Sequence, residues 1–271
     1  MENIKILGAS GGRSAHHHST TIQVEGNIVI DAGNILSALG DDAGKIDHIF
    51  LTHAHLDHII DIAFMIDNFF ASRDKELCVY GLKETLGSIK EHIFNWQIWP
   101  DFSELLFPNR DKKSIKFIPI DYNQTYTIDN VSLTPFKSNH SVPCCGYVVE
   151  KNKHAFLFTS DTYKNREIWD IVNINSRIKS LIIDVSFPSN FEQIAEKSKH
   201  LTPKTLKQEL KHLKRDDVQI YINHIKPNYE NVVRQELREM GISAKNILVG
   251  GETLEWKSGQ IISNKKPTIN H

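Results

Sequence analysis

The stretch "LTHAHLDHI" at residues 51–59 contains three histidines and one aspartate within six positions. An apolar run precedes it in "DHIFLTHAH", as expected of a buried strand. After it, apolar residues recur at helical spacing, namely at Ile59, Ile62, Ala63, Ile66 and Phe70. We therefore expect the histidines to lie at a junction between a strand and a helix.

The spacing of these side chains indicates two metal ions rather than one. On an extended strand end, His53, His55 and Asp57 would project to the same side. A turn there could direct Asp57 and His58 toward a different point. Two ions about 3.5–4 Å apart can stabilise phosphoryl oxygens and generate a hydroxide at neutral pH. The spacing does not fix which residue would bind which ion.

Three later residues could complete such a site: His140 in "KSNHSVP", Asp161 in "LFTSDT" and His224 in "YINHIKP". Each follows an apolar strand and precedes a loop, so each could lie on one rim of a folded domain. Taken alone, they could equally be a turn residue, a cap and a core histidine. Together with the first motif they predict a site of imidazoles and carboxylates. Such ligands favour zinc, with manganese or iron as alternatives.

Composition is that of an ordinary globular protein, which we interpret as one domain over residues 1–271 with a polar tail from about residue 264. The chain has 32 Lys and Arg against 33 Asp and Glu, so no overall charge favours nucleic acid or an anionic membrane. Three cysteines form neither a disulfide framework nor a zinc-finger spacing. No segment has the roughly 18 apolar residues of a membrane span. We expect a soluble, cytoplasmic protein.

Strands and helices alternate along the chain. Alternating apolar residues predict a hairpin turning at 25–27, and the helix after residue 203 begins with the cap Thr202 and a first-turn proline. Further strands are predicted at 4–7, 114–120, 131–136, 145–150, 155–162, 180–187, 219–225 and 246–251. Further helices are predicted at 165–174 and 230–241. The layout favours an α/β fold in which two mixed sheets pack together with helices outside.

The "HAHLDH" stretch with His140, Asp161 and His224 resembles the metallo-β-lactamase superfamily over nearly the whole chain. The resemblance implies an αββα sandwich. It also implies that His53, His55 and His140 bind one metal ion, that Asp57, His58 and His224 bind the other, and that Asp161 bridges them. "HxHxDH" alone would also fit thiolesterases, lactonases, sulfatases and ribonucleases.

Four segments are similar to class II cyclic-nucleotide phosphodiesterases: "THAHLDHI", "VYGLKETLGSIKEHIFNWQIWPDF", "HLTPKTLKQEL" and "INHIKP". This resemblance implies hydrolysis of cAMP or cGMP to 5′-nucleotides by a metal-bridging hydroxide. The chain departs from the class II pattern after the motif, where Asp61 stands in place of a small residue.

The candidate catalytic residues are Asp57, His200 and Asp184. His200 resembles a non-ligand histidine of related ribonucleases and would protonate the leaving oxygen, and Asp184 at a strand end would orient it. Asp31 in "VIDAG" is expected to support a ligand histidine. His200 could instead only cover a helix start, and Asp184 could cap a turn.

Two other functions remain open, a transfer-RNA 3′-processing ribonuclease of the same superfamily and a non-catalytic nucleotide sensor. The near-zero net charge argues against the ribonuclease, and the seven filled ligand positions argue against the sensor. As partners we expect a small-molecule cyclic nucleotide, no membrane and no nucleic acid. The apolar segment "HIFNWQIWP" could pair two copies in a homodimer.

Overall fold

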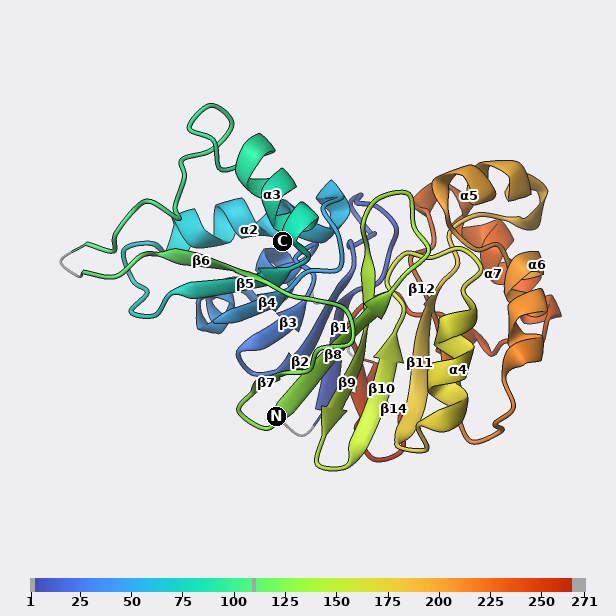
Figure 1. Ribbon diagram of the computed structural model, residues 1–271. Helices are drawn as coiled ribbons and strands as arrows, with labels where there is room; N and C mark the ends of the chain where they lie inside the picture. Colours follow the sequence, from blue (N-terminus) through green and yellow to red (C-terminus); the bar gives the residue numbers. More distant parts are fainter. Residues whose placement is uncertain (1–2, 109–110, 265–271) are drawn as a thin grey trace.

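Two β-sheets pack face to face, with helices on both outer faces (Figure 1). This arrangement is that of a computed structural model, which describes residues 3–108 and 111–264. Both sheets contain parallel and antiparallel neighbours, so the predicted αββα sandwich of two mixed sheets is confirmed. Residues 265–271 of the expected polar tail lie outside the described residues.

The first sheet has eight strands in the order β14-β13-β1-β2-β3-β4-β5-β6. The pairing is antiparallel from β14 to β3, including the predicted hairpin of β2 and β3, and parallel from β3 to β6. The strands are β1 (Asn3–Gly8), β2 (Thr21–Glu25), β3 (Ile28–Ile30), β4 (His48–Phe50), β5 (Leu77–Gly81), β6 (Ile115–Pro119), β13 (Glu252–Glu255) and β14 (Ile261–Asn264).

The second sheet has six strands in the order β12-β11-β10-β9-β8-β7. Strands β10 to β12 are parallel, and the others pair antiparallel. The strands are β7 (Tyr126–Ile128), β8 (Val131–Lys137), β9 (Cys145–Lys151), β10 (His154–Phe158), β11 (Ile178–Asp184) and β12 (Gln219–Asn223).

Apolar residues fill three layers. Phe50, Tyr147 and Phe158 belong to the layer between the sheets. A second layer lies between the first sheet and its helices, α1 (Ile35–Leu39), α2 (Leu56–Phe69) and α3 (Lys83–His92). A third lies between the second sheet and α4 (Arg166–Ile174), α6 (Pro203–Glu209) and α7 (Glu230–Glu239); α5 (Glu192–Ser198) precedes α6. This burial on both sheet faces explains the continuous apolar runs of the parallel strands.

The segments with the predicted site residues all leave the carboxyl ends of strands. They follow β4, β8, β10, β11 and β12. Because β10, β11 and β12 are parallel neighbours, their carboxyl ends lie at one edge of the second sheet. In α/β sheets this edge is the usual place of a ligand site.

One strand prediction was wrong. Residues 246–251 form no strand; Ile247 makes an isolated bridge with Ile222, and the strand begins only at Glu252. Gly250 and Gly251 have φ values of 107° and 89°, a backbone conformation outside the strand region. The two glycines therefore turn the chain so that β13 can pair with β1.

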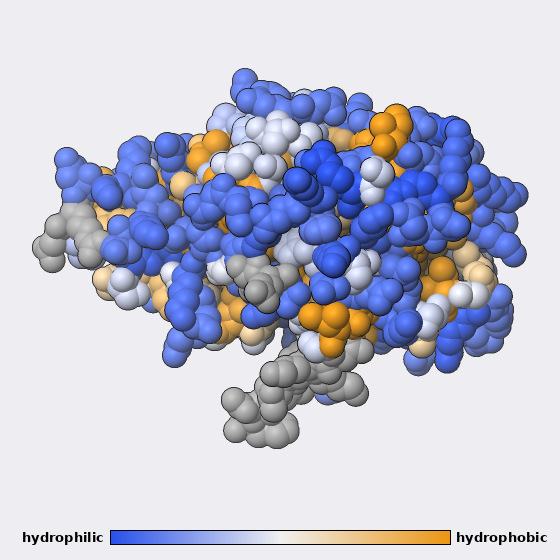
Figure 2. All heavy atoms as spheres, turned by 90° about the horizontal axis from the view of Figure 1, so that it is seen from below, coloured by the Kyte–Doolittle hydropathy of each residue, from blue (hydrophilic) through white to orange (hydrophobic). Residues whose placement is uncertain are grey.

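The surface seen in Figure 2 is mostly hydrophilic, with hydrophobic residues in small separate groups. Within the part of the chain that the structure describes, no helix has both the length and the apolar character needed to cross a bilayer.

Candidate metal centre

The histidine motif lies where a strand gives way to a helix, as predicted. Strand β4 ends at Phe50, and α2 begins at Leu56 with His55 as its N-cap residue. His53 and His55 thus come from the connecting loop, whereas Asp57 and His58 come from the first turn of α2. The start of the helix is the turn that directs the two pairs to different points.

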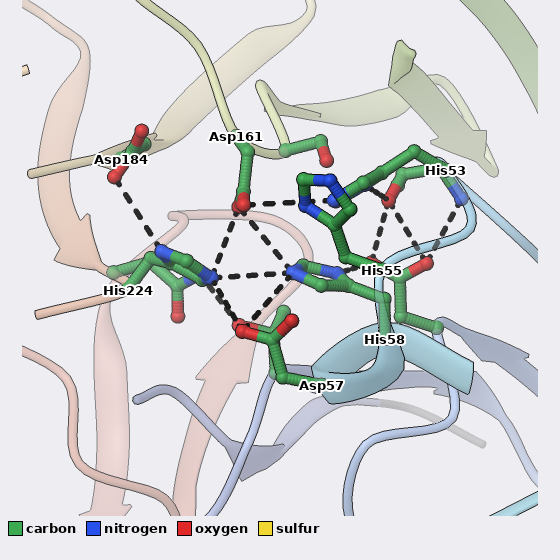
Figure 3. A network of polar contacts seen from close by, with 12 residues as sticks. His53, His55, Asp57, His58, Asp161, Asp184 and His224 are labelled. Carbon is green, nitrogen blue, oxygen red and sulfur yellow. Dashed lines mark hydrogen bonds and ion pairs between the residues drawn. The ribbon is translucent and has the colours of Figure 1, made fainter. Parts of the chain in front are cut away.

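All seven predicted ligands meet in one cluster at the sheet edge. Figure 3 labels six of them, all except His140. One group of atoms within 4.8 Å of one another comes from His53, His55, His140 and Asp161, and another comes from Asp57, His58 and His224. These are the two groups that the resemblance implies. That each side chain binds metal stays a prediction.

Asp161 lies between the two groups. Its Oδ2 is 3.6 Å from His53 Nε2 and 3.9 Å from His140 Nε2. Its Oδ1 is 3.4 Å from His58 Nε2 and 3.2 Å from His224 Nε2. One oxygen therefore faces each group, which is the arrangement that a bridging carboxylate requires.

Asp31 and Thr52 orient two of the histidines. His58 Nδ1 donates to Asp31 Oδ2 at 2.7 Å, as expected of Asp31 from the sequence. Thr52 Oγ1 donates to Asp31 at 2.9 Å and lies 3.0 Å from His53 Nδ1, from which it can accept. Both histidines are thereby left with Nε2 facing the cluster and free to bind an ion.

His140 and His224 are held in the same way by other acceptors. His140 Nδ1 donates to the carbonyl oxygen of Lys199 at 3.2 Å. His224 Nδ1 is 3.0 Å from Ser186 Oγ, which itself donates to Asp184 Oδ1 at 2.7 Å. The role of Ser186 was not predicted. Its position two residues after Asp184, at the same strand end, was the available signal.

The donor set fits a metal site because it is incomplete without a cation. His53 Nε2 and Asp161 Oδ1 are buried and make no hydrogen bond within the described residues. His58 Nε2 and His224 Nε2 are only 3.2 Å apart, although each ring is held through its Nδ1. Burial alone would lower the pKa of His58, but Asp161 and Asp31 raise it well above its ordinary value. The carboxylates around His58 thus favour a positive charge at that position.

Asp57 remains ionised at the mouth of the cluster. Its Oδ2 is 3.3 Å from His224 Nε2. Burial would raise the pKa of Asp57, but contacts with His224 and His58 hold it well below its usual range. The carboxylate also lies in the first turn of α2, where the helix dipole favours negative charge.

His200 lies beside the seven predicted ligands. Its Nδ1 donates to Asp184 Oδ2 at 2.8 Å, and its ring stacks on that of His224 at 5.3 Å between centroids. Burial would lower the pKa of His200, but the Asp184 carboxylate raises it above the ordinary value. One His200 ring nitrogen also falls within the metal-binding distance of Asp161 and His224. The geometry thus suits a proton donor held by Asp184.

Asp61, which departs from the class II pattern, has a structural role. It is buried, and its Oδ2 accepts the backbone N–H of Leu36 in the first turn of α1 at 2.9 Å. Its Oδ1 pairs with Arg13 at 3.3 Å. The carboxylate therefore joins α2 to α1 and does not disturb the cluster.

Comparison with known proteins shows the family and the fold. The family described as "Beta-lactamase superfamily domain" matches residues 27–225. A "Probable 3′,5′-cyclic-nucleotide phosphodiesterase" of Yersinia pestis is 24% identical over 73% of this chain and 62% of its own length, so the match spans less than two thirds of that relative. "Ribonuclease Z" of Staphylococcus haemolyticus is 31% identical over 40% of this chain and 32% of its own length. The structure of unliganded yeast PDE1 superposes with a TM-score of 0.72 at 19% identity, covering 88% of this chain and 93% of that one.

Proposed function

Because the chain belongs to the beta-lactamase superfamily, we propose that it is a two-metal phosphodiesterase that hydrolyses 3′,5′-cyclic nucleotides such as cAMP and cGMP to 5′-nucleotides. The relatives named as cyclic-nucleotide phosphodiesterases support the reaction class. The observation that carries the proposal is the His200–Asp184 pair beside a cluster of seven metal-type donors. This combination offers both a metal site and a separate proton donor.

The two groups of donors would hold two divalent ions, with zinc first and manganese or iron as alternatives. His53, His55 and His140 would hold one ion, Asp57, His58 and His224 the other, and Asp161 both. When bound, such ions stabilise charge on phosphoryl oxygens and activate water at neutral pH. The chain's own part is to fix the ring orientations, through Asp31, Thr52, Lys199 and Ser186.

His200 would supply the proton that the leaving 3′-oxygen needs. An alkoxide is a poor leaving group, so a proton must reach it as the P–O bond breaks. Asp184 binds His200 Nδ1 and thereby leaves Nε2, on the other side of the ring, as the atom that can donate a proton. The raised pKa of His200 increases its protonated fraction near neutral pH, which suits an acid.

A substrate panel tests this proposal. The purified protein, reconstituted with zinc or with manganese, is incubated with cAMP, cGMP, a cyclic dinucleotide and precursor transfer RNA, and the products are identified. We expect release of 5′-AMP or 5′-GMP from the cyclic mononucleotides. Cleavage of the RNA alone would reverse the proposal in favour of a ribonuclease. Cyclic nucleotide binding without turnover, with far fewer than two ions per chain, would favour a sensor.

The ribonuclease is the second candidate because "Ribonuclease Z" of Staphylococcus haemolyticus is 31% identical over 40% of this chain. The net charge of −1 disfavours it, since binding to RNA phosphates needs an excess of Lys and Arg. A small cyclic nucleotide requires only the local charges of the cluster.

We also propose a cytoplasmic location. Cys78, Cys144 and Cys145 are all free, and Cys144 and Cys145 are buried next to each other. Free cysteines are typical of a reducing compartment. Fractionation of cells with an antibody to the protein would test the location, and recovery outside the cytoplasmic fraction would contradict it.

A further inference from the structure

Lys226 brings an ammonium group to the edge of the metal cluster. Its Nζ lies 4.0 Å from Asp57 Oδ2, the same oxygen that is 3.3 Å from His224 Nε2. Within the described residues, Lys226 is the one lysine or arginine that forms an ion pair with a carboxylate of the cluster. With 29% of its side chain exposed, Lys226 borders both the cluster and solvent.

The backbone of Lys226 is fixed relative to the site. Its N–H donates to the carbonyl oxygen of Ser186 at 3.1 Å, and its own carbonyl accepts the N–H of Tyr229 at 2.9 Å. Ser186 is the residue whose hydroxyl contacts both His224 and Asp184. The Lys226 Cα therefore stays next to the cluster while the ammonium group can move on its flexible stem.

The ammonium group of Lys226 lies near Asp57 but does not form a hydrogen bond with it. A distance of 4.0 Å is too long for a hydrogen bond, and Nζ makes none with the residues that the structure describes. If Asp57 binds an ion, its negative charge is shared with that ion. Three N–H donors then remain at the open side of the site, which is where an anionic substrate must enter.

We propose that Lys226 is a positioning residue that binds a non-bridging oxygen of the substrate phosphate and makes the site selective for anionic diesters. This inference rests on the proposed function, because it assumes a phosphodiester substrate. Lysine suits the role as a point charge that can follow a phosphoryl oxygen during the reaction. The alternative is that Lys226 only forms an ion pair with Asp57 and thereby helps Asp57 to bind the metal ion.

The test compares Lys226→Met, Lys226→Arg and Lys179→Met with the wild type. Methionine keeps an unbranched apolar stem and removes the charge. Lys179 is a matched control, since it is 33% exposed, pairs with Asp217 at 2.6 Å, and lies at the opposite end of β11 from Asp184. Zinc-loaded proteins are assayed for metal content, for kcat/KM on bis(p-nitrophenyl) phosphate and cAMP, and for binding of inorganic phosphate by calorimetry.

We expect Lys226→Met to keep both ions but to lose about 10- to 100-fold in kcat/KM on both diesters, the range for one hydrogen bond to a charged group. Phosphate binding should weaken by a similar factor, Lys226→Arg should retain most of both, and Lys179→Met should resemble the wild type. Unchanged kcat/KM and phosphate binding in Lys226→Met would overturn the inference. Loss of metal in Lys226→Met would also overturn the inference, and would show instead that Lys226 helps Asp57 to bind the metal ion.

The two proposals can fail separately. If the wild type cleaves bis(p-nitrophenyl) phosphate but not cAMP, the proposed cyclic-nucleotide substrate is wrong, and the effect of Lys226→Met on the activated diester and on phosphate binding still decides the role of Lys226. If cAMP is cleaved equally well by the wild type and by Lys226→Met, the proposed function stands and the inference about Lys226 is wrong.

Discussion

Four of the histidine rings in the cluster, those of His53, His58, His140 and His224, are oriented by a hydrogen bond that points away from the cluster. His58 relies on Asp31, His140 on the carbonyl of Lys199, and His224 on the hydroxyl of Ser186. Such partners select the tautomer that leaves Nε2 unprotonated, and they raise the affinity of the ring for a metal ion. Substitution of these hydrogen-bond partners should therefore change the metal affinity, as substitution of the ligands themselves would.

Replacing Ser186 with alanine should weaken metal binding by about 10- to 100-fold, the usual effect of losing a partner of a ligand histidine. The reason is that His224 Nδ1 and Asp184 Oδ1 both lose a contact with the Ser186 hydroxyl. Competition with a chromophoric chelator measures the zinc affinity. Ser180→Ala is the control, because Ser180 is also buried on β11 but its hydroxyl has no hydrogen-bond partner within the described residues. Equal affinities in the two variants would contradict this role of Ser186.

Replacing His200 with alanine should leave both ions in place but reduce the rate about 10²- to 10⁴-fold, as expected for a lost general acid. The loss should be much smaller on bis(p-nitrophenyl) phosphate, because a phenolate leaves without needing a proton. Rates on cAMP and on this ester are measured with the same preparation, together with its metal content. Equal losses on both substrates would show that His200 serves binding or structure.

Strained backbone accumulates where the elements of the two sheets end at the cluster. Several non-glycine residues there have positive φ, a conformation that costs of order 1–3 kcal/mol and persists where the surroundings enforce it. They are Asp31 at 59°, Ser160 at 56°, Lys199 at 61° and His224 at 70°. At Lys199, this conformation ends α5 and aims the carbonyl at His140. Hydrogen bonds from the backbone N–H groups of Lys199 and His200 to carbonyl groups of α5 hold that turn in place.

Thr202 begins α6, and its replacement by alanine should lower the free energy of unfolding by about 0.5–2 kcal/mol, the range for a lost N-cap. The structure confirms the predicted cap: Thr202 accepts the N–H of Thr205, and Pro203 occupies the first turn. Thermal and urea unfolding measure the change. Thr202→Ser keeps the hydroxyl and should recover most of the loss; if it does not, the buried methyl group rather than the cap is what stabilises the helix start.

The sequence predicted those features that depend only on residues close together in the chain. The cap at Thr202 and the strand-to-helix junction at His53–His58 could both be predicted from spacing. Contacts of distant residues that stand in no recognisable motif could not. Ser186 meets His224 across 38 positions, and His140 meets Lys199 across 59. The prediction of a strand at 246–251 failed for the same reason, because pairing with the distant strand β1 decides where β13 begins.

On the scale of the whole molecule, one apolar groove runs along α2 from Leu56, the residue between His55 and Asp57. It encloses about 260 Å³ between α2, α3 and the segment that follows α3. Leu56, Phe64 and Ile98 line it and are 59%, 46% and 64% exposed. Large apolar side chains gathered on one face often mark a surface that binds another protein.

We propose that two copies of the chain pair through this groove. Sedimentation velocity over a range of protein concentrations should then show a dimer, because burial of the exposed side chains of Leu56, Phe64 and Ile98 favours association. Ile98→Asp places a charge in the groove and should shift the protein to a monomer, while Ile174→Asp, at another strongly exposed isoleucine, should not. A wild type that stays monomeric at every concentration would exclude the pairing.

The pairing of β1 with β13 also matters while the ribosome is still making the protein. Asn3 pairs with Glu255, so β1 leaves the exit tunnel long before β13, one of its two neighbours in the sheet. Until then one edge of β1 has free N–H and C=O groups, which can bind a strand of another nascent chain. Chains truncated before Glu252, where β13 begins, should therefore aggregate or be degraded, even when they contain every residue of the metal cluster.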